Sequence, residues 1–432
     1  MTGALDIDLQ GLVMAAAHHA ARRDEIATAE VFVRALPRNR NYLVVAGVDE
    51  AADGIAGLRF SADEVAHLRA LPALRDAPDS FFAWLADYRF TGSVRAPAEG
   101  TPVFSGEPLL QITASLTEIS LFETLTLATI QLATTAATKA SRLVVAARGR
   151  DVIEFASRRA AGRAAAAVIA RAAHLAGTAA TSNVEAALRH GIPLVGAVSH
   201  AWVLAHEREP EAFARLLDLF PETDLVPLDT YDVEGALAAL VELERPVRGV
   251  RIDSGDLATI SRRVRAHLDA HGLAATIVTA SGELDEYRID ELVCADAPID
   301  RFGVGKQLAT PADAPALGAV MKLVEIDGPD GVRRPAKRSP GKVNVAGAKQ
   351  VMRRFDASGQ ALGDRVVARD ASAESGERAL LEAVIEGGVR MRPLEPLARA
   401  RARAAEQLRA LPPEVRRLAV PERFPVRFEI EG

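Results

Sequence analysis

The chain has 432 residues, of which 49% are hydrophobic and 25% charged, with a formal net charge of −6. That composition suits a large globular core and more than one domain, and it lacks the basic surplus of a nucleic-acid-binding protein. A single cysteine, Cys294, excludes an intrachain disulfide framework and a cysteine-rich zinc site.

The N-terminal stretch MTGALDIDLQ lacks the charged-then-apolar pattern of a signal peptide. No apolar run approaches the ~20 residues that a membrane-spanning helix needs. We therefore expect a cytoplasmic protein with neither a membrane nor a nucleic-acid partner.

Residues 1–115 are expected to mix helices and short strands. Apolar spacing predicts a helix over Leu9–Ala21. Strands are predicted over Val31–Arg34 and Tyr42–Ala46, separated by a turn at residues 37–40. Residues 97–112, rich in Gly and Pro with two short apolar runs, predict a small β-element.

From residue 116 to residue 335 helices and strands alternate. A helical stretch starts near Leu116, and six short apolar segments then end in polar residues at intervals of roughly 25–30 residues, the length of one βα unit. These segments are DVIEFASRR (151–159), IPLVGAVSH (192–200), DLVPLDTYD (224–232), RGVRIDSGD (248–256), ATIVTASGELDE (275–286) and IDRFGVGKQ (299–307). The pattern predicts an α/β fold with a parallel sheet, and the lack of a G-x-G-x-x-G fingerprint after a strand favours a (β/α) barrel over a doubly wound sheet.

The third stretch, residues 336–432, begins with the basic, glycine-rich run KRSPGKVNVAGAKQVMRRF. A helix is predicted over Pro396–Leu411. The expected domain boundaries are therefore 1–115, 116–335 and 336–432.

Glycine and hydroxyl groups follow the last two predicted strands, where ligands bind in parallel α/β folds. Ser281 and Gly282 follow one strand, and Gly303 and Gly305 with Lys306 follow the next. Free backbone N–H groups at such turns suit a phosphate. Ordinary βα turns, in which glycine serves only a tight bend, remain the alternative.

The stretch RIDSGD places Arg251, Asp253 and Asp256 at one strand end. Carboxylates there suit ribose hydroxyls or Mg²⁺, although Asp256 also suits the N-cap of the next helix. Four cations near strand ends suit a polyanionic substrate, while each alone is commonly a surface residue. They are Arg158 and Arg159 of EFASRR, and Lys139 and Arg142 of ATKASR.

His200 stands where the apolar run Ile192–Val198 breaks. It is either a buried structural histidine or a catalytic group at the mouth of a barrel. The residue pattern alone leaves both interpretations open.

Many motifs follow one another over nearly the whole chain: YRFTGSVRAPAEGTPVFSGEPLLQI, ATKASR, EFASRRA, GTAATSNVEAA, GAVSHAWV, LDTYD, VRIDSGDL, ASGELDEY and GVGKQL. Together they resemble the nicotinate phosphoribosyltransferases. The resemblance implies an irregular (β/α) barrel with a smaller α+β domain built from both chain ends, and a homodimer with active sites near the subunit interface. It implies transfer from 5-phosphoribosyl 1-pyrophosphate to nicotinate in NAD salvage, giving nicotinate mononucleotide and pyrophosphate, usually with ATP hydrolysis and Mg²⁺.

The resemblance also assigns roles. His200 matches the histidine that the family phosphorylates with ATP, and Arg251 matches the residue that faces the pyridine acceptor. Arg158 and Lys139, with Mg²⁺, are expected to stabilise the leaving pyrophosphate. The expected catalytic residues are His200, Arg158 and Asp253. The expected substrate-binding residues are Gln10, Lys139, Arg142, Ala197, Arg251, Asp256, Ser281, Gly282, Gly303, Gly305, Lys306 and Asn344.

Several positions depart from the family pattern. Gln10 replaces a tyrosine that stacks on nicotinate, and Ala197 replaces a threonine before the histidine. Asn344 replaces a threonine and Ala346 a common proline in the basic loop, and Lys306 replaces a threonine in the GVGT motif. A lost ring removes stacking worth on the order of 1 kcal/mol.

These departures keep other interpretations open. One is a relative that acts on nicotinamide or another aza-heterocycle. A second is a non-catalytic sensor of phosphoribosyl ligands, and a third is an unrelated barrel lyase or aldolase. The third lacks the expected Schiff-base lysine or histidine cluster at the strand ends.

Overall fold

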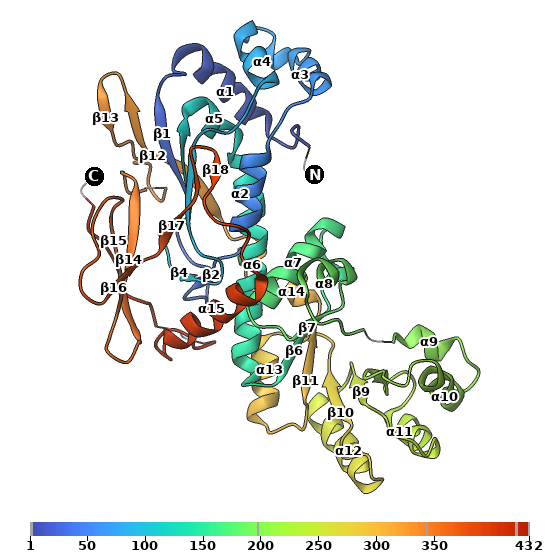
Figure 1. Ribbon diagram of the computed structural model, residues 1–432. Helices are drawn as coiled ribbons and strands as arrows, with labels where there is room; N and C mark the ends of the chain where they lie inside the picture. The colour runs from blue at the N-terminus through green and yellow to red at the C-terminus, as the bar shows by residue number, and fades with distance from the viewer. Residues whose placement is uncertain (1–2, 197, 343, 420–421, 431–432) are drawn as a thin grey trace. The chain divides into compact units, whose positions relative to one another are not determined.

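A computed structural model of the chain describes residues 3–196, 198–342, 344–419 and 422–430. It divides into two compact units (Figure 1). We call residues 1–135 with 316–432 the chain-end unit, and residues 136–315 the barrel unit. The boundaries fall at 135 and 315 rather than at the predicted 115 and 335, so the chain-end unit holds more of the chain than expected.

The barrel unit contains one sheet of six parallel strands in the order β7-β6-β11-β10-β9-β8. Neighbouring strands in the sheet follow one another in the sequence, except that the last strand, β11, pairs with the first, β6. A barrel requires such pairing of the last strand with the first. The predicted parallel barrel is confirmed, with an open seam between β7 and β8 among the described strands. The strands are β6 (Asp151–Glu154), β7 (Ala180–Thr181), β8 (Val226–Pro227), β9 (Gly249–Ile252), β10 (Ile277–Ala280) and β11 (Arg301–Val304).

Helices separate these strands, as the sequence predicts. Their apolar faces are buried; in α12, for example, Leu257, Val264 and Leu268 lie inside. The helices are α6 (Glu123–Ala147), α7 (Arg163–Leu175), α8 (Val184–His190), α9 (His200–Leu204), α10 (Glu209–Leu219), α11 (Val233–Glu242), α12 (Leu257–Ala270), α13 (Glu286–Cys294) and α14 (Lys306–Ala309), with a 3₁₀ turn η2 at Ser157–Arg159.

One of the six predicted strands is wrong. Within the described part of residues 192–200 only an isolated parallel bridge forms, between Thr181 and Leu194. Pro193 has no N–H to donate to a ladder, and Gly196 weakens an extended segment. The short strand β7, which the sequence analysis did not predict, lies between β6 and this bridging segment.

The chain-end unit is built on a seven-stranded sheet that interleaves both ends of the chain, in the order β13-β12-β1-β5-β3-β17-β18. Figure 1 shows β1, in blue, beside the orange β12, and the two pair in antiparallel register. Its strands are β1 (Ile26–Val33), β3 (Ser93–Pro97), β5 (Pro108–Ser115), β12 (Ala319–Gly328), β13 (Gly331–Arg333), β17 (Leu381–Glu386) and β18 (Val389–Arg390). The mixed α/β class and the domain formed from both chain ends are thus confirmed.

Two smaller sheets and several helices complete the unit. The predicted helix over Leu9–Ala21 is present as α1, and the predicted C-terminal helix is α15, Leu397–Ala410. The remaining elements are β2 (Leu43–Val44), β4 (Pro102–Val103), β14 (Lys349–Phe355), β15 (Ala361–Ala368), β16 (Glu377–Ala379), β19 (Val426–Phe428), α2 (Val48–Gly57), α3 (Ala62–Arg69), α4 (Asp79–Ala86), α5 (Leu116–Leu121) and the 3₁₀ turn η1 (Pro72–Leu74).

A buried ion pair joins the two chain ends inside this unit. Lys349 Nζ lies 2.7 Å from Glu30 Oε2, and the two side chains are 3% and 1% exposed. Glu30 Oε1 also accepts hydrogen bonds from Gln111 Nε2 at 2.9 Å and from the Lys349 N–H at 3.0 Å. Removing either partner would leave a buried charge without its counter-charge, so the pair favours this assembly of the two chain ends. No helix in the described ranges is both long and apolar enough to cross a membrane.

Candidate active site

Strand register gathers four residues at the carboxyl edge of the barrel sheet. Pro227 pairs with Arg251, Arg251 with Thr279, and Ala280 with Phe302. The same register continues past the ends of these strands. It aligns the second residue after Pro227 and Arg251 with the first residue after Ala280 and Phe302, and these four residues form a row. The row consists of Asp229, Asp253, Ser281 and Gly303. Neighbours in one register direct their side chains to the same face of a sheet.

Arg251, which lies on β9 two residues before Asp253, forms a closed ring of contacts with Asp253 and Ser281 of this row. Arg251 Nε donates to Ser281 Oγ at 2.8 Å, and Ser281 Oγ donates to Asp253 Oδ1 at 2.9 Å. A second guanidinium nitrogen of Arg251 forms an ion pair with Asp253. Arg251 is 6% exposed and Asp253 29%, so a rigidly held carboxylate faces outward from a buried cation. The structure brings these three predicted residues together, and their roles toward a substrate stay predictions.

Asp229 supports this ring from the neighbouring strand end. Its Oδ2 accepts hydrogen bonds from the Asp253 N–H at 2.8 Å and from Ser254 Oγ at 2.7 Å. Its Oδ1 is buried and accepts no hydrogen bond within the described chain. A buried carboxylate oxygen without a donor is costly, so this atom is prepared for a proton donor or a cation.

His200 lies at the same cluster, as the first residue of α9. Its Nδ1 is 3.0 Å from Thr230 Oγ1. Its Nε2 lies 3.8 Å from both Asp229 Oδ1 and Asp253 Oδ2. The ring is 32% exposed, so it is not the buried structural histidine of the alternative interpretation.

Close packing explains the glycines at this edge. Gly282 has φ +106°, and a Cβ there would lie 2.5 Å from the Asp253 carbonyl oxygen. A Cβ on Gly303 would lie 2.5 Å from the Phe155 ring, and one on Gly305 would lie 2.9 Å from the Phe155 oxygen. These glycines let neighbouring loops close over the row, and their role in phosphate binding stays a prediction.

Arg158 and Arg159 lie in the turn after β6, which is the neighbour of β11 in the sheet. Both are exposed, at the same edge as the row. The turn is held by Asn183, whose Nδ2 donates to Ser157 Oγ at 3.0 Å. Arg158 makes no hydrogen bond or ion pair with His200 or Asp253, so its approach to a shared substrate stays a prediction.

Lys139 and Arg142 differ from the expectation that they face a polyanion. Both are 2% exposed, and both pair with the fully buried Glu286, at 2.5 Å and 2.8 Å. Lys139 also lies 3.0 Å from Asp313. Burial alone would raise the pKa of Glu286, but the charges of Lys139 and Arg142 outweigh it and lower that pKa. The structure thus uses these two cations to balance an internal carboxylate.

Two further predicted ligand residues have local partners. Asp256 caps α12, accepting from the Ala258 and Thr259 N–H groups and from Thr259 Oγ1. These bonds lower the pKa of Asp256, with the Thr259 hydroxyl as the largest cause. Lys306 pairs with Glu283 at 2.6 Å on the surface. The N-cap interpretation of Asp256 is confirmed, and its ligand role stays a prediction.

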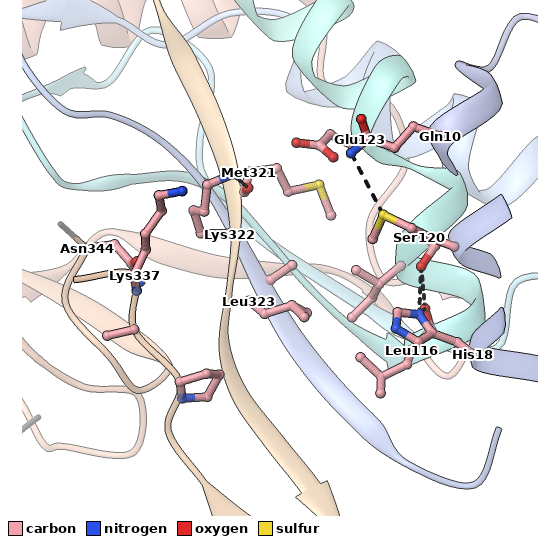
Figure 2. Close-up of a pocket in the computed structure, with 15 residues that line it drawn as sticks. Gln10, His18, Leu116, Ser120, Glu123, Met321, Lys322, Leu323, Lys337 and Asn344 are labelled. Carbon is pink, nitrogen blue, oxygen red and sulfur yellow. Dashed lines mark hydrogen bonds between the residues drawn. The ribbon is translucent and has the colours of Figure 1, made fainter. Parts of the chain in front are cut away.

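Gln10 and Asn344 lie in the chain-end unit, where both line one cavity of about 430 Å³ (Figure 2). We call it the chain-end pocket. Figure 2 shows Lys322 and Lys337 on the side of Asn344, and His18 on the side of Gln10. Burial is the main cause that lowers the pKa of Lys322. The charge of Glu123 raises this pKa, and the charges of Arg34 and Lys337 lower it. Ala197 lies outside the described residues.

The described residues hold no group of three or more His, Cys, Asp and Glu side chains placed to bind a metal ion. Asp229 and Asp253 nevertheless offer two adjacent carboxylates at the barrel edge, one with an unsatisfied oxygen. Mg²⁺ keeps several waters and takes one or two carboxylates together with substrate phosphates. The residues present therefore fit a Mg²⁺ ion carried in on a diphosphate.

The sequence analysis missed Asp229, Thr230, Ser254 and Phe155 as site residues. The first two stand in the motif LDTYD directly after an apolar run, the same signal that identified Asp253. Phe155 follows β6 and reaches Gly303 across the sheet, which no local pattern reveals.

The chain is 42% identical over 427 residues to nicotinate phosphoribosyltransferase pncB2 of Mycobacterium tuberculosis, covering 96% of this chain and 89% of that protein. This chain belongs to the nicotinate phosphoribosyltransferase family. It is also 35% identical over 333 residues to nicotinate phosphoribosyltransferase of Bacillus subtilis, covering 75% and 67% of the two chains. Family models for the nicotinate phosphoribosyltransferase N-terminal and C-terminal domains match residues 5–131 and 373–431.

Solved structures agree with this membership at the level of the fold. Human nicotinic acid phosphoribosyltransferase superposes with a TM-score of 0.83 at 24% identity, covering 98% of this chain and 97% of that one. Nicotinate-nucleotide pyrophosphorylase of Pyrococcus furiosus superposes with a TM-score of 0.77 at 25% identity, covering 94% of each chain. Both solved structures thus share the overall fold of this chain.

Replacing Gly282 with alanine is expected to destabilise the protein more than the same change at Gly272. Both glycines have positive φ, but only the Gly282 Cβ would meet a backbone oxygen at 2.5 Å, since nothing lies within 4 Å of Gly272. Gly272→Ala should cost about 1 kcal/mol and Gly282→Ala about 3 kcal/mol in the free energy of unfolding. Chemical denaturation measures both. Equal losses would show that Gly282 is not pressed against the Asp253 loop.

Proposed function

We propose that this protein transfers the phosphoribosyl group of 5-phosphoribosyl 1-pyrophosphate to nicotinate, forming nicotinate mononucleotide and pyrophosphate. The observation that carries the proposal is the ring of Arg251, Asp253 and Ser281 beside His200 at the barrel edge. Support comes from the 42% identity to a protein named for this reaction. The physiological setting we propose is NAD salvage in the cytoplasm.

The reaction exchanges one bond for another at the C1 atom of the ribose. The C1–O bond breaks with its electron pair going to pyrophosphate, and the pyridine nitrogen supplies the pair for the new C1–N bond. Positive charge grows on the ribose as the old bond breaks. The Asp253 carboxylate, fixed by Arg251, is oriented to hold ribose hydroxyls beside that charge.

The acceptor needs a flat apolar surface and a cation for its carboxylate. Phe155 supplies a ring next to Gly303 at the same edge. Arg251 uses Nε and one terminal nitrogen for Ser281 and Asp253. Its other terminal nitrogen is left for a carboxylate, an interaction for which the planar guanidinium is well suited.

The leaving pyrophosphate needs positive charge. Arg158 extends from the exposed turn after β6 and is the protein cation that we assign to it. Asp229 and Asp253 would hold Mg²⁺ on the diphosphate, and the ion would supply charge stabilisation for the departing oxygen. Gln10 and Asn344 stay proposed substrate-binding residues of the chain-end pocket, and the homodimer stays part of the proposal.

We further propose that ATP phosphorylates His200. Thr230 occupies Nδ1, so Nε2 is the nitrogen directed at Asp229 and Asp253. Transfer of the γ-phosphoryl group to Nε2 would release ADP, and attack by water would return the histidine and phosphate. A phosphoryl group there would add negative charge and acceptor oxygens beside the diphosphate site and so alter substrate affinity.

A second candidate acceptor class has one specific observation in its favour. Gln10 stands where the family has a stacking tyrosine, and among the described residues its amide hydrogen-bonds to Met14 Sδ alone, at 3.8 Å. An amide in place of a ring favours an acceptor that can hydrogen-bond, such as nicotinamide or another aza-heterocycle.

Product analysis separates these possibilities. Purified protein with 5-phosphoribosyl 1-pyrophosphate and Mg²⁺ is expected to convert nicotinate to its mononucleotide with one pyrophosphate released per product, and to use nicotinamide far less. Chromatography and a pyrophosphate assay measure both. Preferential ribosylation of a different base supports the second candidate, and background pyrophosphate release with every base supports a non-catalytic sensor.

Replacing His200 with alanine is expected to abolish ATP hydrolysis and the acid-labile phosphoenzyme while leaving slow, ATP-independent transfer. The ring nitrogen is lost, but the Arg251–Asp253–Ser281 ring is untouched. Radiolabelled ATP and product chromatography read the two activities separately. His271→Ala, a change at an exposed histidine at the end of α12, is the matched control and should behave as wild type. Full ATPase activity in His200→Ala removes the proposed role.

A further inference from the structure

A second cavity, of about 600 Å³, lies in the chain-end unit and shares no lining residue with the chain-end pocket. It is formed by residues 34–41 after β1, by Phe104 and Ser105, and by residues around β19. We call it the arginine cavity. Its size is in the range of small-molecule sites, and the transfer reaction assigned to the barrel edge does not use it.

The lining is cationic. Arg34, Arg38, Arg40 and Arg423 contribute to it, whereas no aspartate or glutamate does. Arg38 and Arg423 are exposed and form no ion pair with any described residue. Arg40 is only 3% exposed, so a guanidinium group is built into the wall rather than lying on the surface. Converging guanidinium groups in a protein of net charge −6 indicate a site for a multiply charged oxyanion.

Aromatic rings form the rest of the wall. Phe104 and Phe424 stack with ring centroids 4.2 Å apart and are almost fully buried. Phe428 is 39% exposed, which is unusual for a phenylalanine. A Cβ on Gly106 would lie 2.8 Å from Phe428 Cζ, so the glycine lets this ring seat closely. An exposed, positioned ring beside cations is suited to stacking on a planar base.

The cavity is held together from three parts of the chain. Asn41 Nδ2 donates to the Val415 oxygen at 3.2 Å and to the Glu422 oxygen at 2.5 Å. Ser105 Oγ donates to the Arg34 oxygen at 2.5 Å. These bonds fix the backbone of the arginine-bearing segment 34–41 against the C-terminal segment, so the wall of the cavity is formed before any ligand arrives.

We propose that the arginine cavity is a nucleotide-binding site, with Arg38 and Arg423 on the phosphates of a nucleoside diphosphate or triphosphate and Phe428 on its base. Inorganic di- or polyphosphate shares the phosphate chemistry but has no ring for Phe428. The two sources are therefore separable by a change at Phe428. The proposal does not depend on the transfer reaction assigned to the barrel edge.

Calorimetric titration with ADP tests the proposal on the full-length protein. The double variant Arg38→Ala/Arg423→Ala removes two exposed cations and is expected to bind one fewer ADP per chain than wild type, with affinity at that site weakened at least about tenfold. The control double variant Arg427→Ala/Arg399→Ala removes the same charge from exposed positions outside the lining and should keep the wild-type stoichiometry. Unchanged ADP stoichiometry and affinity in Arg38→Ala/Arg423→Ala overturn the proposal.

Phe428→Ala distinguishes a nucleotide from phosphate alone. It should weaken ADP several-fold at this site and leave pyrophosphate binding unchanged. Equal ADP affinity in Phe428→Ala and wild type would overturn the nucleotide assignment. Without ADP and at saturating substrates, all these variants are expected to transfer the phosphoribosyl group at the wild-type rate. The transfer assay therefore tests the barrel reaction, and the ADP titration tests this proposal.

Discussion

The parallel register of β8, β9, β10 and β11 is the constraint on which the candidate site depends. It aligns Asp229, Asp253 and Ser281 in one row at the carboxyl edge. None of these residues is near another in the sequence, and a slip of one residue would turn a side chain to the other face of the sheet. Sheet closure through β11 and β6 brings the Arg158 turn to the same edge.

Some buried carboxylates of the described chain are paired with buried cations, and one at the barrel edge has an oxygen without a donor. Glu286 and Glu30 are matched with internal cations, which fixes α6 against α13 and joins the two chain ends. Asp229 Oδ1, in contrast, is buried without a donor beside His200. An unpaired carboxylate oxygen is costly to bury, and its place beside His200 offers a position for a proton donor or a cation.

Sequence patterns predicted much of the barrel because each strand end carries its own local signal, a buried run followed by Asp, Ser or Gly. The patterns wrongly predicted a strand at residues 192–200, because the segment is apolar but contains Pro193 and Gly196, which interrupt a strand. They also assigned Lys139 and Arg142 to a substrate, because the pairing with Glu286 joins helices about 140 residues apart. Phe155 and the arginine cavity were missed for the same reason, since both form only when distant segments meet.

The most direct measurement of the central claim is the kcat/KM for 5-phosphoribosyl 1-pyrophosphate of Asp253→Asn, compared with Asp269→Asn at an exposed position on α12. If the barrel edge holds the ribose, the first variant keeps its shape but loses the charge, and kcat/KM should fall by about 100-fold or more. Asp269→Asn should leave it unchanged. Equal kcat/KM in Asp253→Asn and wild type would contradict a reaction centred on this edge.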